Sequence, residues 1–200
     1  MTPDRSAWDP WHPDVLAERL AGVDVPWCVA GGWAIDLFHG SPTRAHGDLE
    51  IAVPADRFAE IAARLADLEF HVVQHGTHAA VSADTLRGTH QTWGLDRSAG
   101  VWRVDVLREP HAGDTWVYRR NDRIRLPYRA AIRRTASNIP YLAPEIVLLF
   151  KAKGPRPKDE ADLRVALPLL SAGQRRWLAD ALAVAHKDHP WRTAVSTDSR

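Results

Sequence analysis

Apolar residues along the first part of the chain recur with the period of a helix in some segments and with that of a strand in others. Within residues 55–68 they share one helical face: Phe58, Ile61, Leu65 and Leu68. The segments on either side, 48–53 and 70–76, are short and contain β-branched residues, as is typical of strands. The order strand, helix, strand predicts a βαβ-like unit and a mixed α/β core.

Turn and cap residues delimit further elements upstream. Residues 13–22 begin with proline, end with glycine and carry apolar residues every three or four positions, which predicts a short helix. Residues 25–30 are typical of a strand, and residues 33–40, which end at Gly40, of a second helix. The loop that follows leads directly into the strand at residues 48–53.

Short β segments are predicted for residues 77–121. The clearest is residues 101–109, where Asp105 and Leu107 share one face because alternate side chains of a strand point the same way. Residues 116–128 predict a hairpin of two strands.

The pattern changes after Pro140. Residues 141–153, 158–170 and 172–186 each have a helical apolar period. We therefore expect two regions: an α/β domain over residues 1–138 and a helical bundle over residues 139–200 that packs on it.

Composition narrows the class of protein. The 200 residues include 26 Lys and Arg against 25 Asp and Glu, so the net charge of +1 gives no overall attraction to nucleic acid or anionic membrane. The single cysteine, Cys28, lies in an apolar strand and predicts a buried thiol in a reducing compartment. The longest apolar run, residues 146–150, is far short of the ~20 residues of a membrane span, and the first residues lack a signal sequence. We expect a cytoplasmic protein.

Two carboxylates stand two residues apart in the strand at residues 48–53. Asp48 and Glu50 therefore project from one face while Leu49 faces the other way. Adjacent carboxylates repel each other unless a cation lies between them, and hard cations such as Mg²⁺ choose oxygen ligands. With Asp105 on a later strand, the three acids would hold one or two Mg²⁺ ions that bridge a nucleotide's phosphates and activate an attacking hydroxyl.

A double glycine, Gly31-Gly32, stands where the strand at residues 25–30 meets the next helix. Without side chains, its backbone N–H groups can approach a phosphate closely, and the helix N-terminus favours negative charge. Simpler interpretations stay open: the turn only reverses the chain, Asp48 and Glu50 are solvated acids on an edge strand, and Asp105 pairs with a nearby base.

The motif GGWAIDLFHGSPTRAHGDLEIAV resembles the signature of the aminoglycoside and lincosamide nucleotidyltransferases, a minimal branch of the polymerase-β-like superfamily. RVDVL resembles the strand with that family's third acid, and PYLAPEIVLLFKAKGPRPKDEADL its helical segment. The resemblance covers residues 13–191 and implies a mixed sheet flanked by helices with a C-terminal helical region. It also implies transfer of a nucleoside monophosphate from an NTP, usually ATP, to a hydroxyl of a small molecule, such as an antibiotic or natural product.

The resemblance assigns roles to the acids. Asp48 and Glu50 match the paired metal ligands, and Asp105 matches the third acid, which serves as a metal ligand or as the base that removes the hydroxyl proton. The family usually has Asp at the second ligand, and here it is Glu50. The extra methylene moves the carboxylate by about a bond length, which a demanding Mg²⁺ octahedron has to accommodate.

The resemblance also assigns residues to the nucleotide. Gly31, Gly32 and Trp33 match the nucleotide-binding turn, and Arg44 would clamp phosphate oxygens with its planar fork. In the helical region, Lys151 and Lys158 would reach the β- and γ-phosphates. Structural alternatives are a bracing role for Arg44, a packing role for Trp33, and a favourable helix-end position for the two lysines.

Two other functions are compatible with the sequence. One is a toxin-type nucleotidyltransferase that modifies tRNA or a protein, for which residues 119–135 offer the basic face; the same arginines would otherwise pair with acids of the chain. The other is a catalytically inactive nucleotide-binding homologue. A zinc site at His71, His75 and His78 is disfavoured, because strand and turn lack the helical convergence of ligands.

Overall fold

The computed structural model describes residues 4–74 and 77–196. The helices are α1 (Pro13–Arg19), α2 (Gly31–His39), α3 (Phe58–Arg64), α4 (Ala83–Arg87), α5 (Tyr128–Ala131), α6 (Pro144–Lys151), α7 (Pro157–Ala166), α8 (Ala172–Ala185) and α9 (Trp191–Ser196). The strands are β1 (Cys28–Val29), β2 (Glu50–Pro54), β3 (Glu69–Gln74), β4 (Thr77–Ala80), β5 (Gln91–Asp96), β6 (Val101–Glu109), β7 (His111–Ala112), β8 (Thr115–Val117), β9 (Arg125–Pro127), β10 (Ile132–Arg134) and β11 (Pro140–Leu142).

A large mixed sheet forms the centre of the fold, with strand order β10-β11-β1-β2-β6-β5-β3-β4. The pairs β2–β6 and β1–β11 are parallel, and the other neighbours are antiparallel. Strands β2 and β3 flank α3 in sequence, but β6 and β5 lie between them in the sheet. A mixed sheet with flanking helices is the predicted α/β (α+β) class.

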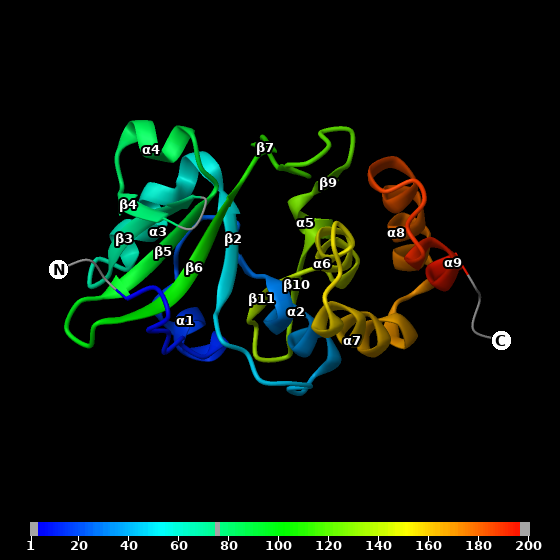
Figure 1. Ribbon diagram of the computed structural model, residues 1–200, viewed down its shortest axis with the longest axis horizontal. Helices are drawn as coiled ribbons and strands as arrows, with labels where there is room; N and C mark the ends of the chain where they lie inside the picture. The colour runs from blue at the N-terminus through cyan, green and yellow to red at the C-terminus, as the bar shows by residue number, and fades with distance from the viewer. Residues whose placement is uncertain (1–3, 75–76, 197–200) are drawn as a thin grey trace.

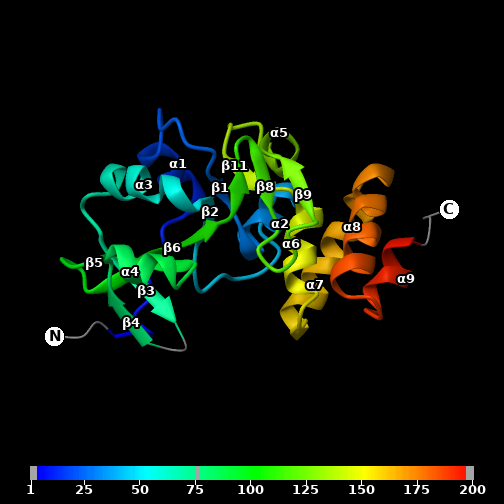
Figure 2. The same ribbon diagram turned by 90° about the horizontal axis from the view of Figure 1, so that it is seen from above.

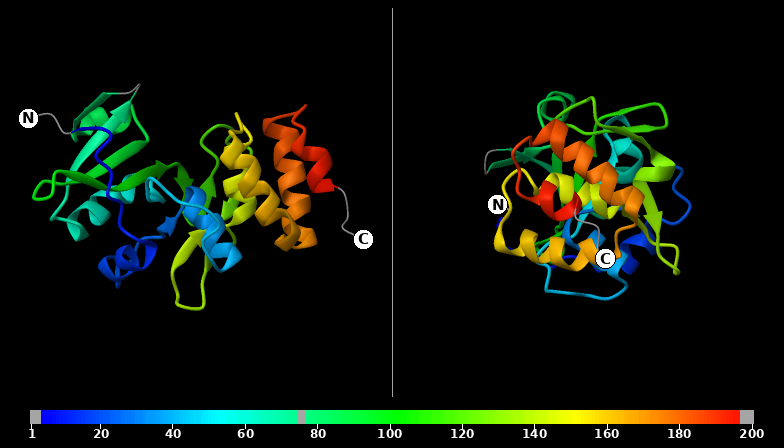
Figure 3. Two further views of the ribbon diagram at one scale, coloured as in Figure 1. Left: turned by 60° about the horizontal axis from the view of Figure 1, so that its bottom comes forward. Right: turned by 90° about the vertical axis from the view of Figure 1, so that its right-hand side faces the viewer.

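The molecule is elongated, with β3, β4 and β5 toward one end, β10 and β11 in the middle, and helices α8 and α9 at the other end (Figure 1). Figure 2 shows β1, β2 and β11 between the end formed by β3 to β5 and the end formed by α6 to α9. Figure 3 shows α8 and α9 as the outermost helices of the second end. Because α2 contacts both α6 and α7, the helical region packs on the glycine-containing helix of the sheet region.

The two faces of β2 and β6 differ in chemistry. Leu49, directly before β2, and Ile51 on β2 are fully buried in the core, while Glu50 points to the opposite face. On β6, Arg108 lies on the core side with its guanidinium carbon 5.7 Å from the ring centroid of Phe58 in α3. The predicted amphipathic helix therefore covers the apolar face of the sheet, and the face with the acids is left for the helical region.

Cys28 lies in this core, 2% exposed. Burial, and then the charge of Glu109, raise the pKa of its thiol above the ordinary value. The thiol is therefore protonated and inert, as the sequence predicts.

The structure differs from the predicted elements in several places. The strand predicted over residues 48–53 begins only at Glu50, so Asp48 lies in the loop before it rather than within the strand. Residues 140–142 form β11 rather than the start of a helix, because they pair with both β1 and β10 and the helix begins at Pro144. Helix α4 occupies part of a region predicted as β, and its N-terminus has a capping box from Ser82 and Thr85. The hairpin over residues 116–128 is confirmed by the antiparallel pairing of β8 and β9.

Within the described residues, no helix combines the length and apolar composition that a membrane span requires. The predicted boundary at residue 139 lies just before β11, which is a strand of the central sheet. The division into a sheet domain and a helical domain stays a prediction.

Candidate active site

The acids lie on neighbouring strands of the sheet. Glu50 on β2 is the register partner of Asp105 on β6, and partners in a parallel pair point to the same face. Asp48 lies in the loop that leads directly into β2. The structure thus brings Asp105 beside the two acids that stand together in the sequence, while their catalytic roles stay predictions.

Asp105 is a buried carboxyl group, 2% exposed. Its Oδ2 accepts a hydrogen bond of 2.5 Å from Nε2 of Gln91, whereas its Oδ1 has no hydrogen-bond partner. Burial and the neighbouring Glu50 and Asp48 hold the pKa of Asp105 well above its ordinary value. An unpartnered oxygen among like charges is a group that a cation or a proton would stabilise.

Glu50 is subject to opposing influences. Burial and the charge of Asp48 raise its pKa, while the charges of Lys151, Lys158 and Arg156 lower it, with a net rise. Cations from the helical region therefore lie within electrostatic reach of the acid cluster. Arg156 is a member of this group that the sequence did not indicate.

The donor chemistry of the acids suits Mg²⁺, which prefers carboxylate oxygens. Asp105 Oδ1 and the mutual repulsion of the three carboxylates fit a bound cation. Their ligand atoms are not gathered, however: among the described residues, no group of three or more His, Cys, Asp or Glu side chains is arranged to hold a metal ion. The same finding covers His71 and His78, while His75 lies outside the described residues.

The double glycine begins helix α2. Both glycines lie against side chains of the segment that contains the acids: Gly31 against Glu50 of β2, and Gly32 against Arg44 of the preceding loop. Gly31 has a φ of 59°, and a Cβ built on it would lie 1.6 Å from Oε2 of Glu50. A Cβ on Gly32 would lie 2.0 Å from Nη2 of Arg44. The turn predicted to approach a phosphate thus also makes room for a carboxylate and a guanidinium group.

Gly31→Ala should lower the free energy of unfolding by about 1–2 kcal/mol through its left-handed φ and should also displace Glu50. Gly113→Ala is the matched control, because Gly113 has a φ of 54° and open space around it. Urea unfolding of both variants measures the shared backbone strain. Pyrophosphate release should fall in Gly31→Ala alone, and equal activity in the two variants would contradict the contact with Glu50.

Arg44 braces the loop against the helical region. Its Nε and Nη2 donate to the two carboxylate oxygens of Asp162 at 2.9 and 3.1 Å, and Asp162 is 1% exposed. Burial acts to raise the pKa of Asp162, but the bonds from Arg44 and Lys151 outweigh it and the pKa lies below its ordinary value. The planar fork of Arg44 is used on a carboxylate of α7, and binding of phosphate by it stays a prediction.

Lys151 occupies the centre of an ion-pair network. Its Nζ lies 2.8 Å from Asp159 and 2.8 Å from Asp162. Asp159 also accepts from Nε of Arg156 at 2.8 Å. An ammonium group has three donors, so Lys151 keeps one for a ligand. Lys158 is exposed and lies close enough to influence Glu50.

Asp159 gives the network a pH dependence. Burial acts to raise its pKa, but the bonds from Arg156 and Lys151 prevail and lower it. A carboxyl with a lower pKa in the folded state contributes stability above its unfolded pKa of about 4, and this stability is lost as the pH falls through the folded pKa. The free energy of unfolding of Asp159→Asn should therefore be below wild type at pH 7 and converge with it toward pH 2. A constant gap across urea titrations would contradict this.

Trp33 and His46 pack on each other. Their rings are stacked with centroids 4.4 Å apart, and His46 Nε2 lies 2.6 Å from Oδ2 of Asp36. The buried Asp36 also accepts from the backbone and hydroxyl of Thr43. Asp36 therefore fixes the loop between α2 and β2 through Thr43 and His46. The sequence motif did not indicate this role. The geometry around Trp33 supports packing rather than contact with a nucleotide.

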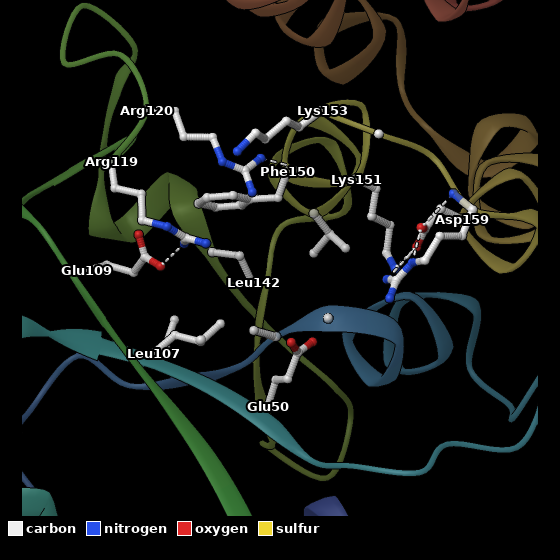
Figure 4. Close-up of a pocket in the computed structure, with 16 residues that line it drawn as sticks. Glu50, Leu107, Glu109, Arg119, Arg120, Leu142, Phe150, Lys151, Lys153 and Asp159 are labelled. Atoms are coloured by element: carbon white, nitrogen blue, oxygen red, sulfur yellow. Dashed lines mark hydrogen bonds and ion pairs between the residues drawn. The ribbon is translucent and has the colours of Figure 1, made fainter. Parts of the chain in front are cut away.

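A cavity of about 380 Å³ lies between the acid face of the sheet and helices α6 and α7 (Figure 4). Gly31, Glu50 and Lys151 line it. Asp48, Asp105, Trp33, Arg44 and Lys158 are not among its lining residues. Lining residues that the sequence did not assign to a nucleotide include Leu107, Glu109, Arg119, Arg120, Phe150 and Arg156.

Two arginines of the basic run at residues 119–135 make contacts within the chain. Arg119 pairs with Glu109, and Nη1 of Arg120 donates to the backbone oxygen of Phe150 at 2.7 Å. Arg119 and Arg120 therefore interact with other groups of the chain, as in the alternative in which the arginines of the basic run pair within the protein.

Comparison with known proteins relates the chain to adenylyltransferases. A family model described as aminoglycoside-2''-adenylyltransferase matches residues 14–108. The solution structure of the antibiotic-resistance factor ANT(2'')-Ia is 16% identical, with a TM-score of 0.55 over 86% of this chain and 89% of that one. No curated protein matches the chain.

Two crystal structures share the fold as well. ANT(2'')-Ia in complex with adenylyl-2''-tobramycin is 15% identical, with a TM-score of 0.55 over 84% of this chain and 94% of that one. The lincomycin-bound lincosamide antibiotic adenylyltransferase LnuA is 15% identical, with a TM-score of 0.52 over 76% of this chain and 92% of that one. The family resemblance and the fold class predicted from the sequence are confirmed.

Proposed function

We propose that this chain, in which residues 14–108 match the aminoglycoside-2''-adenylyltransferase family model, transfers AMP from ATP to a hydroxyl group of a small molecule. The observation that carries the proposal is one cavity with Glu50 on the sheet side and Lys151 and Arg156 on the helical side. Such a cavity is suited to a triphosphate that reacts beside an acid cluster.

The triphosphate is assigned to the end of the cavity with Gly31, Lys151 and Arg156. The free donor of Lys151 and the guanidinium group of Arg156 supply the positive charge that a polyphosphate needs. Asp159 and Asp162 hold Lys151 in place rather than neutralise it fully, because Arg44 and Arg156 share these carboxylates.

The acids are assigned to the reacting centre. Asp48 and Glu50 would hold Mg²⁺, and Asp105 would either be a third metal ligand or act as the base. When bound, Mg²⁺ neutralises phosphate charge and favours in-line displacement. The hydroxyl oxygen of the acceptor bonds to the α-phosphorus, the bond from that phosphorus to the bridging oxygen of pyrophosphate breaks, and pyrophosphate leaves. If Asp105 is the base rather than a metal ligand, it would accept the hydroxyl proton on Oδ1, the oxygen without a hydrogen-bond partner.

The acceptor is assigned to the class of hydroxyl-bearing antibiotics or related natural products. Two proteins of the same fold support this class, one bound to adenylyl-2''-tobramycin and one to lincomycin. Recognition of an acceptor depends on loops and pocket walls, which differ at 15–16% identity.

Pyrophosphate release from ATP, measured with Mg²⁺ and then with Mn²⁺ across a panel of hydroxyl acceptors, tests the proposal. The expected result is acceptor-dependent release and a mass gain of one AMP on the acceptor. ATP binding without transfer to any acceptor would favour the inactive homologue, for which the longer arm of Glu50 would be the cause. Transfer to tRNA or protein in place of small molecules would favour the toxin-type enzyme.

A further inference from the structure

We infer that Arg119, Phe150 and Arg120 form a nucleobase subsite at one end of the cavity, and that this subsite binds the flat face of the base rather than its hydrogen-bonding edge. The inference rests on the proposed function and adds to it the class of nucleotide that the enzyme accepts.

The three side chains form a stack. The guanidinium carbon of Arg119 lies 4.5 Å from the ring centroid of Phe150, and that of Arg120 lies 5.3 Å from it. Figure 4 shows the two guanidinium groups on opposite sides of the ring, with Arg119 on the side of Leu107. A guanidinium plane that stacks on a ring with one face can stack on a nucleobase with the other.

Both arginines of this end are held by other groups of the chain. Arg119 forms an ion pair with Glu109, which is 2% exposed, and Arg120 donates to the backbone oxygen of Phe150. The second carboxylate oxygen of Glu109 has no partner and is shielded from solvent. The ion pair with the buried Glu109 fixes the guanidinium group of Arg119, so Glu109 is a positioning residue for this arginine.

The order of groups along the cavity matches the order of groups in a nucleotide. In Figure 4, Arg119 and Phe150 lie on one side of Glu50, and Lys151 and Asp159 lie on the other. With the α-phosphate beside Glu50 and the β- and γ-phosphates toward Lys151, the base reaches the stack. Leu107 and Leu142 line the cavity on the way and offer apolar contact.

The charge of this end selects a base over an amine-bearing acceptor. Arg119, Arg120 and Lys153 line it with positive charge, against the single carboxylate of Glu109. An acceptor with several ammonium groups would be repelled, whereas a neutral base with an electron-rich face is attracted to guanidinium groups.

Stacking predicts broad nucleotide acceptance, because every base has a π face. In binding measurements without acceptor, ATP, GTP, CTP and UTP should have dissociation constants within about tenfold of each other, with purines the tighter pair because of their larger face. Inorganic tripolyphosphate should bind as well, since it needs only the cationic end.

Two variants test the residues, and one serves as the control. Arg119→Met and Phe150→Leu should each weaken all four NTPs by about tenfold or more and leave tripolyphosphate binding unchanged. Retained tripolyphosphate binding also shows that the variants are folded. Arg123→Met alters an exposed arginine of the same segment and should bind NTPs as wild type does.

Three results would overturn the subsite. One NTP that binds more than a hundredfold better than the others would show recognition of the base edge. An equal loss of tripolyphosphate in Arg119→Met would make this arginine a phosphate ligand, and unchanged NTP binding in both variants would place the base elsewhere. Normal NTP binding and the expected variant losses, without transfer to any acceptor, would remove the proposed function and support the subsite.

Discussion

Asp48→Ala is expected to lower transfer by about a thousandfold, because the residue is assigned to the metal ion that supplies several kcal/mol of transition-state charge stabilisation. Asp48 lies in a loop and is partly exposed, so the free energy of unfolding should change by about 0.5 kcal/mol or less. Removal of one of three mutually repelling carboxylates offsets part of any lost contact.

Pyrophosphate release in the presence of an accepted acceptor measures this effect, and urea unfolding measures the stability. Asp24→Ala is the matched control, because Asp24 is an exposed acid in a loop before β1 and outside the cavity. Near-wild-type transfer in Asp48→Ala would remove the assignment of the acid cluster as the reacting centre.

Asp162→Ala is expected to lower the free energy of unfolding by about 3 kcal/mol, because removal of one partner of a buried ion pair leaves the other charges uncompensated. Asp162 pairs both with Arg44, in the loop between α2 and β2, and with Lys151 of α6. All three side chains are largely shielded from water. The variant should also weaken tripolyphosphate binding, since Lys151 loses one of the two carboxylates that fix it.

Asp67→Ala provides the comparison. Asp67 forms a similar pair with Arg19 at 2.7 Å, but both side chains are more than a third exposed, so the expected loss is about 1 kcal/mol or less. Urea unfolding of both variants at pH 7 tests the difference. Equal losses would mean that the network around Asp162 contributes no more than a surface pair.

Local patterns were sufficient for many elements. The strand at residues 101–109 has the predicted bounds, and the helix with Phe58 and Ile61 buries the predicted face, because the periods of strand and helix are written in consecutive residues. The motif also showed the family resemblance, which the family model matching residues 14–108 confirms. The prediction of a helix that includes residues 141 and 142 was wrong, because pairing of residues 140–142 with β1 and β10 prevailed over the local helical pattern.

Within the site, the sequence identified residues more readily than contacts. Glu50 and Lys151 line the cavity as their positions in the motifs suggested. The family resemblance assigned Arg44 to phosphate, and its partner Asp162, which is 118 positions away, could not be read from the motif. Glu109, Arg119 and Phe150 carry no local signal as a group, since they come from different parts of the chain.

The sequence by itself determined most element types, the glycine turn, the acid pair and the family resemblance, since each depends on residues close together in the chain. The tertiary structure alone decided that Asp105 stands opposite Glu50, that Arg44 binds Asp162, and that the two glycines make room for side chains. The reason is physical: strand register and ion pairing between distant segments follow from how the whole chain buries its apolar faces, which no local pattern records.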